Sequence, residues 1–166
     1  MLTFPLPEST CACLGDVTPP TLYALGNADL LQIPLLGLLC SRQCPGSIIL
    51  ETLDRTPEWV REGRVIVSGF HAPLEQQVLR SLLRRSGRAV KVLARTLDGY
   101  RPPPQEREAL DDGRLLLLSP FPPTVRRTTR ATAMTRNRLV AALCAELCAP
   151  YCREGSALAE LVSEKP

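Results

Sequence analysis

The sequence has few aromatic residues. Phenylalanine, tyrosine and tryptophan make up 4% of the 166 residues, whereas apolar residues of all kinds make up 45%. The core must therefore be built from aliphatic side chains. Stacking of bases on aromatic rings, which proteins that bind single strands commonly use, has few candidates here. The apolar content is nevertheless high enough for a folded domain, which argues against disorder of the whole chain.

Long apolar runs and the start of a leader peptide are also missing. The apolar stretch at residues 33–40 is much shorter than the roughly 18 residues of a membrane-spanning helix. The N-terminus lacks the basic segment of a signal peptide. The seven cysteines are an odd number without a secretory signal, which favours reduced thiols. We therefore expect a cytoplasmic protein that does not enter a membrane.

Acidic residues are absent from two stretches of the chain, between Glu75 and Asp98 and between Asp112 and Glu146. The bases there are Arg80, Arg84, Arg85, Arg88, Lys91 and Arg95 in the first stretch, and Arg114, Arg126, Arg127, Arg130, Arg136 and Arg138 in the second. Such blocks indicate an anionic partner. The first block is equally well explained as a solvated helix surface. The second falls mostly in a predicted loop that needs no such charge to fold.

Short apolar runs alternate with helical patterns along most of the chain. Residues 1–20 are predicted to be an irregular arm, and residues 21–166 a single domain that begins with one or two short helical turns. Predicted strands cover residues 34–40, 64–68, 89–93 and 114–119, and predicted helices cover 47–62, 73–86, 105–111, 135–143 and 154–163. Residues 144–149 fit either a fifth strand or an extension of the preceding helix. Pro57, after Thr56, predicts a break in the first helix.

This alternation predicts an α/β fold of three layers, in which helices cover both faces of a mainly parallel sheet. In such sheets ligands bind at the carboxyl ends of the strands, beside helix N-termini. Three loops reach this edge, at residues 41–46, 69–73 and 119–135. The candidate residues on these loops and strand ends are Ser41, Arg42, Ser68, Gly69, His71, Arg126, Arg127 and Arg130. We expect a site for a phosphate-bearing ligand there.

Four segments, in this order, carry a family resemblance. They are Cys40-Ser41-Arg42, Ser68-Gly69, Leu118-Ser119-Pro120-Phe121-Pro122-Pro123, and Arg136-Asn137-Arg138-Leu139-Val140-Ala141-Ala142-Leu143. This arrangement resembles the DNA-processing protein A family (DprA, also called Smf). That family has Gly-Ser-Arg, Ser-Gly-x-Ala-x-Gly-Ile-Asp, Leu-Ser-Glu-x-Pro-Pro and Arg-Asn-Arg-Ile-Ile-Ala-Gly-Leu at these places. Gly155-Ser156-Ala157-Leu158 is similar to a further Gly-Ser segment of the family.

The resemblance implies a Rossmann-like domain that binds single-stranded DNA and helps to load a recombinase on it. It places the site at Ser41, Arg42, Ser68, Gly69, Arg136, Asn137 and Arg138. The chain departs from the family pattern at a few positions, where Cys40 stands for the first glycine, Ala72-Pro73 for Arg-Gly, and Pro120 for glutamate. The second loop thereby lacks a basic side chain, and its proline lacks a backbone N–H donor.

The arginines of the last segment have two interpretations. At a helix start, Arg136, Asn137 and Arg138 would offer backbone N–H groups and two guanidinium groups to one phosphate. Alternatively, Arg138 pairs with Glu75 or another buried acid and locks the loop.

The single histidine and the cysteines are open to similar alternatives. His71 would act as a general acid or base only with a carboxylate partner, for which Glu75 is near in sequence, and is otherwise a polar contact. Cys144, Cys148 and Cys152 recur every four residues, but this spacing matches neither zinc nor iron–sulfur patterns. We interpret the cysteines as structural thiols.

The sequence thus favours a domain that binds single-stranded nucleic acid without catalytic residues, cofactor or metal. Affinity would come chiefly from arginine–phosphate contacts and would weaken with salt. A pocket for a nucleotide or another phosphorylated small ligand is the first alternative, and a structural or oligomerisation domain is the second. The expected partner is single-stranded DNA or a nucleotide-type anion, and a homodimer is the candidate assembly.

Overall fold

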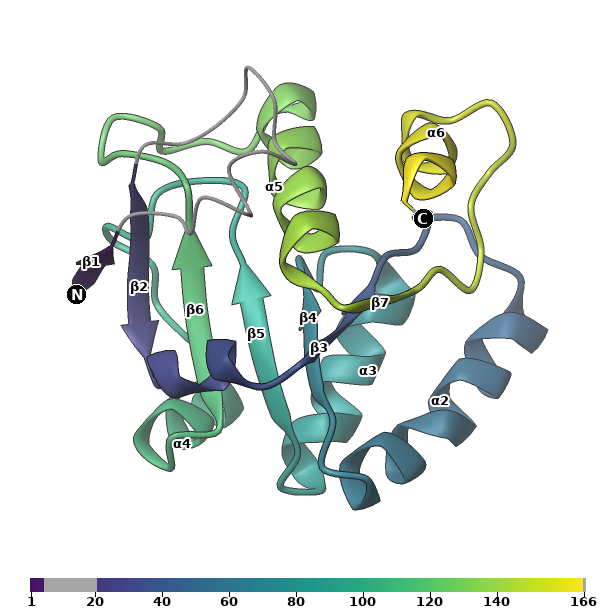
Figure 1. Ribbon diagram of the computed structural model, residues 1–166, viewed down its shortest axis with the longest axis horizontal. Helices are drawn as coiled ribbons and strands as arrows, with labels where there is room; N and C mark the ends of the chain where they lie inside the picture. Colours follow the sequence, from purple (N-terminus) through teal and green to yellow (C-terminus); the bar gives the residue numbers. More distant parts are fainter. Residues whose placement is uncertain (5–20, 166) are drawn as a thin grey trace.

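A seven-stranded sheet forms the centre of the computed structural model, which describes residues 1–4 and 21–165. The strands lie in the order β1-β2-β6-β5-β4-β3-β7. Their bounds are β1 Leu2–Phe4, β2 Leu22–Gly26, β3 Leu35–Leu38, β4 Val65–Ser68, β5 Arg88–Val92, β6 Leu115–Ser119 and β7 Glu146–Cys148. The strands β3 to β7 are parallel, whereas β2 pairs antiparallel with both β1 and β6 (Figure 1). The predicted α/β fold with a mainly parallel sheet is confirmed.

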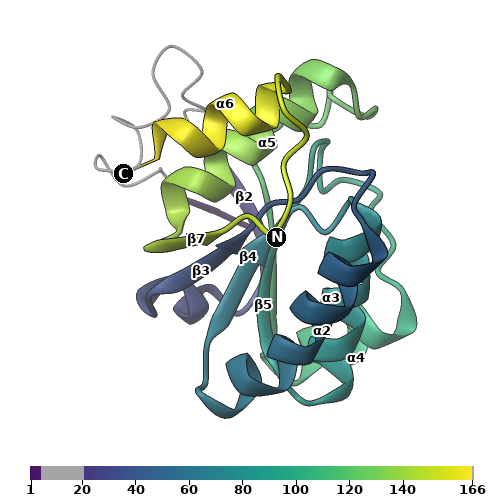
Figure 2. The same cartoon turned by 90° about the vertical axis from the view of Figure 1, so that its right-hand side faces the viewer.

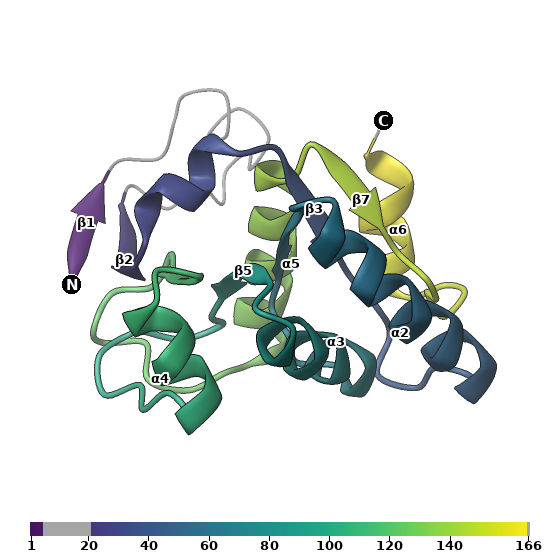
Figure 3. The ribbon, with the colours of Figure 1, turned by 90° about the horizontal axis from the view of Figure 1, so that it is seen from below.

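Helices cover both faces of the sheet. Their bounds are α2 Gly46–Arg61, α3 Pro73–Arg84, α4 Pro104–Asp111, α5 Arg130–Leu143 and α6 Ala157–Glu164, with a short 3-10 helix, η2, at Ala28–Gln32. The helices α2, α3 and α4 lie in a row along one face (Figure 3). Helix α5 covers the other face, with α6 packed beside it (Figure 2). In the described ranges, no helix is long and apolar enough to cross a membrane.

The crossover through α5 creates a switch in the order of the strands. From β3 the chain adds β4, β5 and β6 successively on one side, and then places β7 on the opposite side of β3. In open parallel sheets, ligands bind beside the carboxyl ends of the strands at such a switch. The topology therefore draws attention to the loops that follow β3, β4 and β7.

Burial on both faces explains the continuous apolar runs of the sequence. In β6, Leu115 and Leu117 pack into the core under α2, α3 and α4, whereas Leu116 and Leu118 face α5. All four side chains are 0% exposed. Full burial of such a side chain contributes roughly 1.5–3 kcal/mol, so the strands themselves hold the two helical layers together.

The first part of the chain differs from its predicted structure. Residues 21–32 were expected to be short helical turns, but Leu22–Gly26 forms β2 and only Ala28–Gln32 is helical. Asn27 caps this short helix, because its side chain accepts a hydrogen bond from Asp29 N. Leu2–Phe4 forms the edge strand β1 instead of an irregular segment. The rest of the predicted arm, residues 5–20, lies outside the described residues.

Two helices also differ from expectation. The break predicted at Pro57 is wrong, since α2 continues through it with Trp59 buried against the core. Helix α5 begins at Arg130 rather than at residue 135, and the arginine-rich loop is correspondingly shorter. Residues 144–149, where two outcomes were open, contain the strand β7. The remaining strands and helices have bounds within three residues of those predicted.

Candidate functional site

A cavity of about 630 Å³ opens where the loops after β3 and β4 meet the first turns of α5 and α6. Its wall carries Arg42 from the first loop, His71 from the second, and Arg130 and Arg136 from α5. Glu75, on the first turn of α3, also lines it. Segments far apart in the sequence thus converge at the switch in strand order, as expected for a ligand site in this type of sheet.

Glu75 ties the two strand-end loops together. Its Oε1 accepts a hydrogen bond from Cys40 N at 2.9 Å, after β3. Its Oε2 accepts from His71 N at 2.9 Å and from Ala72 N at 3.2 Å, after β4. The side chain is buried, and burial raises the pKa of Glu75, while the amide donors and the charge of Arg136 oppose that shift. Since all these partners are donors, the contacts fit an ionised carboxylate that accepts only.

Arg136 lies against the backbone of the loop after β4. A Cβ atom placed on Gly69 would come within 2.4 Å of Arg136 Nε and 2.6 Å of its Cδ, so only glycine admits the arginine in this position. Arg136 is 7% exposed, and its Nε donates to Asn137 Oδ1 at 3.0 Å. Burial lowers the pKa of Arg136, but a guanidinium keeps its charge in proteins. The structure thereby holds a buried, charged fork at the cavity.

The backbone N–H groups around the cavity are largely used within the protein. Phe70 N donates to Ser68 Oγ at 3.0 Å, and the next two amides donate to Glu75. At the start of α5, Thr132 N donates to Thr129 Oγ1, and at the start of α6, Ala159 N donates to Ser156 Oγ, both at 3.1 Å. An anion in the cavity would therefore be bound mainly by side chains.

The charge of the cavity wall is positive. Three arginines and one carboxylate line it, which leaves an excess of positive charge. Burial lowers the pKa of His71, and the neighbouring charges of Arg136 and Arg42 lower that pKa further. Both effects favour the neutral imidazole, and the arginines that lower its pKa are the ones that an incoming anion would meet.

The structure brings about half of the predicted site residues to the cavity. Those that line it are Ser41, Arg42, His71, Arg130, Arg136 and Asn137. Those that do not are Ser68, Gly69, Arg126, Arg127 and Arg138. Ser68 and Gly69 do not line the cavity but support residues that do. Ser68 Oγ accepts from Phe70 N in the loop after β4, and Gly69 leaves space for the Arg136 side chain.

The three predicted arginines outside the cavity wall, Arg126, Arg127 and Arg138, are exposed to solvent. Arg126 lies 3.8 Å from Asp98, with both side chains more than half exposed, so this pair contributes little to stability. Arg138 belongs to the same helix as Arg136 but does not line the cavity. Ser41 lines the cavity, and its hydroxyl accepts from Arg153 N at 2.9 Å.

Several interpretations of the sequence are corrected by this geometry. Arg136, Asn137 and Arg138 are not at a helix start, because α5 begins six residues earlier and their amides lie inside the helix. Glu75 is not paired with Arg138, since its oxygens accept from backbone amides and its charged neighbour is Arg136. Its contact with His71 involves the backbone amide of that residue, so no acid–base pair with the imidazole forms.

Sequence reasoning missed two further parts of the cavity and the full role of Glu75. Thr128 and Thr129 before α5 and Ser156 before α6 line it. Thr129 and Ser156 are helix N-caps, which are recognisable as such only once the helix boundary is known. Glu75 was noted only as a partner for other side chains. Its position three residues after the helix N-cap Ala72 was the available signal, since an acid at that position accepts from the backbone of the cap.

Two of the residues that depart from the family pattern fit their local structure. Cys40, in place of glycine, donates its amide to Glu75 and buries its side chain in the core. Pro73 is the first residue of α3, where a helix does not need an N–H group.

The cysteines near the end of α5 and after it lie on different elements. Cys144 ends α5, Cys148 ends β7 and Cys152 follows in a loop. Cys40 and Cys144 are buried, and Cys44, Cys148 and Cys152 are partly buried free thiols. In the described part of the chain, no group of three His, Cys, Asp or Glu side chains is arranged to hold a metal ion.

Fold and site together define a Rossmann-like α/β protein with a basic cavity at the carboxyl ends of its strands. The family model of DNA recombination-mediator protein A matches residues 7–156, so the chain belongs to this family. The resemblance inferred from the sequence motifs is thereby confirmed.

Two curated relatives support this assignment. The chain is 33% identical over 131 residues to the protein Smf of Synechocystis sp. (strain ATCC 27184 / PCC 6803 / Kazusa), a match that covers 75% of this chain and 32% of the relative. It is 27% identical over 129 residues to the DNA processing protein DprA of Streptococcus pneumoniae (strain ATCC BAA-255 / R6), covering 76% and 44%. The matches thus span less than half the length of either relative.

Two solved structures share the fold. The X-ray structure of DprA from Streptococcus pneumoniae superposes with a TM-score of 0.76 at 21% identity, covering 99% of this chain and 59% of the other. A structure of DNA processing protein A from Helicobacter pylori, which concerns the single-stranded DNA binding mode of that protein, gives a TM-score of 0.78 at 23% identity, covering 99% and 78%. At these identities the likeness establishes the fold, and the predicted Rossmann-like architecture is confirmed.

Proposed function

We propose that the chain binds single-stranded DNA through its phosphate backbone in the cavity at Arg136, as a binding step in DNA processing. The observation that carries the proposal is the state of the Arg136 side chain. It is nine-tenths buried, and among the described residues only its Nε has a hydrogen-bond partner. Its two terminal nitrogens therefore offer donors to a ligand at the cavity, in a geometry that suits phosphate oxygens.

The other two arginines of the wall lie at the surface. Arg42 and Arg130 are exposed, and neither forms an ion pair within the described ranges. A phosphate bound at Arg136 would lie between the loop after β3, which carries Arg42, and the start of α5, which carries Arg130. The arrangement supports one buried phosphate contact with neighbouring phosphates at the rim. The family membership and the single-stranded DNA binding of the Helicobacter pylori protein favour DNA as the source of these phosphates.

A titration with a labelled single-stranded oligonucleotide, followed by fluorescence anisotropy, tests the proposal. If three arginines contact phosphates, log K should fall with log salt concentration with a slope of about −2, or roughly twentyfold between about 50 and 200 mM salt. Arg42→Ala should reduce the slope by about 0.7. Absence of binding at low salt would contradict the proposal, as would binding that does not depend on salt.

Binding should also strengthen at acidic pH through His71. In the free protein, burial and two arginines depress the pKa of this imidazole. A bound phosphate adds negative charge and raises the pKa, so binding is coupled to proton uptake. Affinity should therefore be constant at high pH and rise as pH falls through the raised, bound-state pKa. Titrations between about pH 8 and pH 5.5 check this, and His71→Gln should abolish the rise while leaving binding at pH 8 nearly unchanged.

A mononucleotide or another phosphorylated small ligand is the second candidate. The volume of the cavity favours it, since 630 Å³ lies in the usual range for small-molecule pockets. A small-ligand site predicts a saturable rise in melting temperature with one mononucleotide and little response to oligonucleotides. Single-stranded DNA predicts the reverse, so paired thermal melts separate the two candidates.

A further inference from the structure

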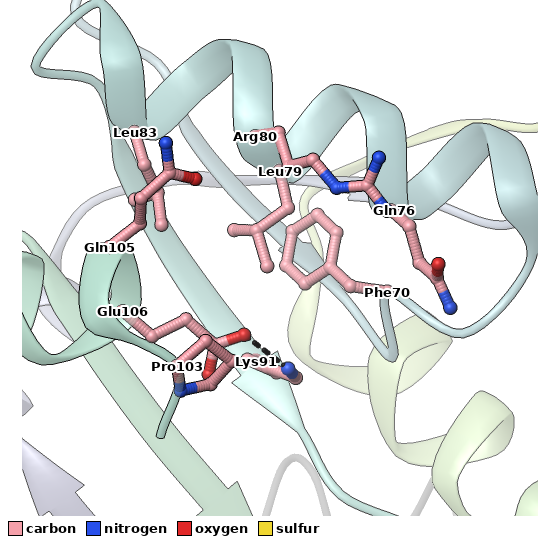
Figure 4. A pocket seen from close by; sticks show the side chains of 9 residues that line it. All are labelled: Phe70, Gln76, Leu79, Arg80, Leu83, Lys91, Pro103, Gln105 and Glu106. Atoms are coloured by element: carbon pink, nitrogen blue, oxygen red, sulfur yellow. Dashed lines mark hydrogen bonds and ion pairs between the residues drawn. The ribbon is translucent and has the colours of Figure 1, made fainter.

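We propose that a second groove, between α3 and α4, takes one nucleobase of the strand whose phosphates lie in the cavity. The groove has a volume of about 300 Å³. Phe70 lies at its base, and Leu79, Leu83 and Pro103 form apolar walls (Figure 4). This inference rests on the proposed function, because it concerns the bases of the same strand.

The interior of the groove is unsuited to an anion. Lys91 Nζ and Glu106 Oε1 form an ion pair at 2.5 Å, with both side chains largely buried (Figure 4). Tyr100 OH donates to Glu106 Oε2 at 2.8 Å and accepts from Lys91 Nζ at 2.9 Å. These charges neutralise each other and their hydrogen bonds are satisfied, so they offer no net charge to a ligand. What enters between the apolar walls must be neutral.

The rim of the groove carries polar groups that suit the edge of a base. Gln76 and Gln105 are exposed and face the groove from α3 and α4, and carboxamides present a donor and an acceptor together. Arg80 extends along α3 toward Gln76 above Phe70 (Figure 4). It is exposed and forms no ion pair among the described residues. A guanidinium there can stack on a base or contact its phosphate. A flat, neutral, hydrogen-bonding nucleobase matches this combination.

A single short loop separates the groove from the cavity. Phe70 lines the groove and the next residue, His71, lines the cavity. Their Cα atoms are about 3.8 Å apart, as in any trans peptide. Gln76 joins the two sides, because its Nε2 donates to His71 O at 3.0 Å. Phe70 has a φ of +47°, an unusual conformation for a bulky residue, and this turn sends two consecutive side chains to different openings. One or two nucleotides of a strand can therefore occupy both.

The test compares two single strands of equal length and charge, one with bases and one in which every base is removed. Both are titrated against the full chain by fluorescence anisotropy. The wild type should bind the strand with bases about tenfold more tightly. Gln105→Trp, which fills the groove from its rim, should abolish this preference and leave binding of the abasic strand unchanged. Arg80→Ala should lower affinity for the strand with bases severalfold more than Arg84→Ala, which removes the same charge one turn further along α3.

The outcomes separate this inference from the proposed function. If neither strand binds, the proposed function fails and the groove fails with it. If both strands bind with equal affinity, phosphate binding stands and the groove is excluded. An unchanged preference in Gln105→Trp would also exclude the groove. Thermal melts of each variant establish that the fold is retained, which is expected because the substituted side chains are exposed.

Discussion

Replacement of Arg136 by alanine should lower the affinity for single-stranded DNA about 10- to 100-fold. Charged hydrogen bonds contribute roughly 1.5–3 kcal/mol, and this buried guanidinium is shielded from competing water. Arg136→Lys should recover only part of the loss, because an ammonium keeps the charge but lacks the planar fork. Anisotropy titrations at one fixed salt concentration measure both effects.

Arg138→Ala is the matched control. It removes the same charge from the same helix, two residues away, but Arg138 is exposed and does not line the cavity. We expect a change of less than about threefold, typical of a distant surface charge. Equal losses in Arg136→Ala and Arg138→Ala would mean that general charge, rather than the cavity, governs binding.

A substitution that does not touch the charge offers an independent check on the position of Arg136. Gly69→Ala would place a methyl group within 2.4 Å of Arg136 Nε and must displace the side chain. We expect it to weaken DNA binding in the same direction as Arg136→Ala. Gly46→Ala is the control, because a Cβ there would have no neighbour within 4 Å. DNA binding by Gly69→Ala at wild-type affinity would show that the present position of Arg136 is not required.

The second large effect concerns stability. Glu75→Gln should lower the free energy of unfolding by about 2–4 kcal/mol, because an amide group would face three backbone donors that now meet a carboxylate. Each buried donor left without an acceptor costs about 1–3 kcal/mol, and part of this loss is offset because no charge is buried any longer. The expected fall in melting temperature is roughly 5–15 °C, measured by thermal denaturation followed by circular dichroism.

Glu108→Gln makes the same chemical change at an exposed position of α4. Its side chain forms no ion pair or hydrogen bond within the described ranges, so we expect a change of less than about 0.5 kcal/mol. A Glu75→Gln protein as stable as Glu108→Gln would overturn the view that Glu75 joins the two strand-end loops.

Local patterns in the sequence were sufficient for most of the sheet. The strands β3 to β6 are apolar runs flanked by turn residues, and such runs are buried on both faces wherever helices alternate with parallel strands. The strand β2 could not be predicted in this way. Only Leu22 and Ala24 are buried in it, and it exists because it pairs with β6, whose paired residues lie 90 or more positions later. Pairing over such a distance leaves little local pattern.

The helix boundaries around the site were similarly ambiguous. Residues 130–134 contain two alanines and only one large apolar side chain, Met134, so the start of α5 had no strong periodic signal. Thr129 caps this helix together with Thr132, a local hydrogen-bond pattern that many threonine pairs could form. The predicted boundary therefore placed Arg136 at a helix start, whereas the structure places it inside the helix. Its backbone amide is then not free for an anion, and only its side chain can bind one.

The sequence by itself determined the fold class, the family and the edge of the sheet at which the candidate site was sought. These depend on apolar periodicity and on short motifs, which are local properties of the chain. Only the tertiary structure distinguished the arginines that line the cavity from those that do not. Burial of Arg136 beside Gly69, the three amides held by Glu75, and the exposure of Arg138 depend on contacts between segments that are distant in sequence. Arginines that look equivalent along the chain differ in solvation, and solvation decides how strongly each can bind a phosphate.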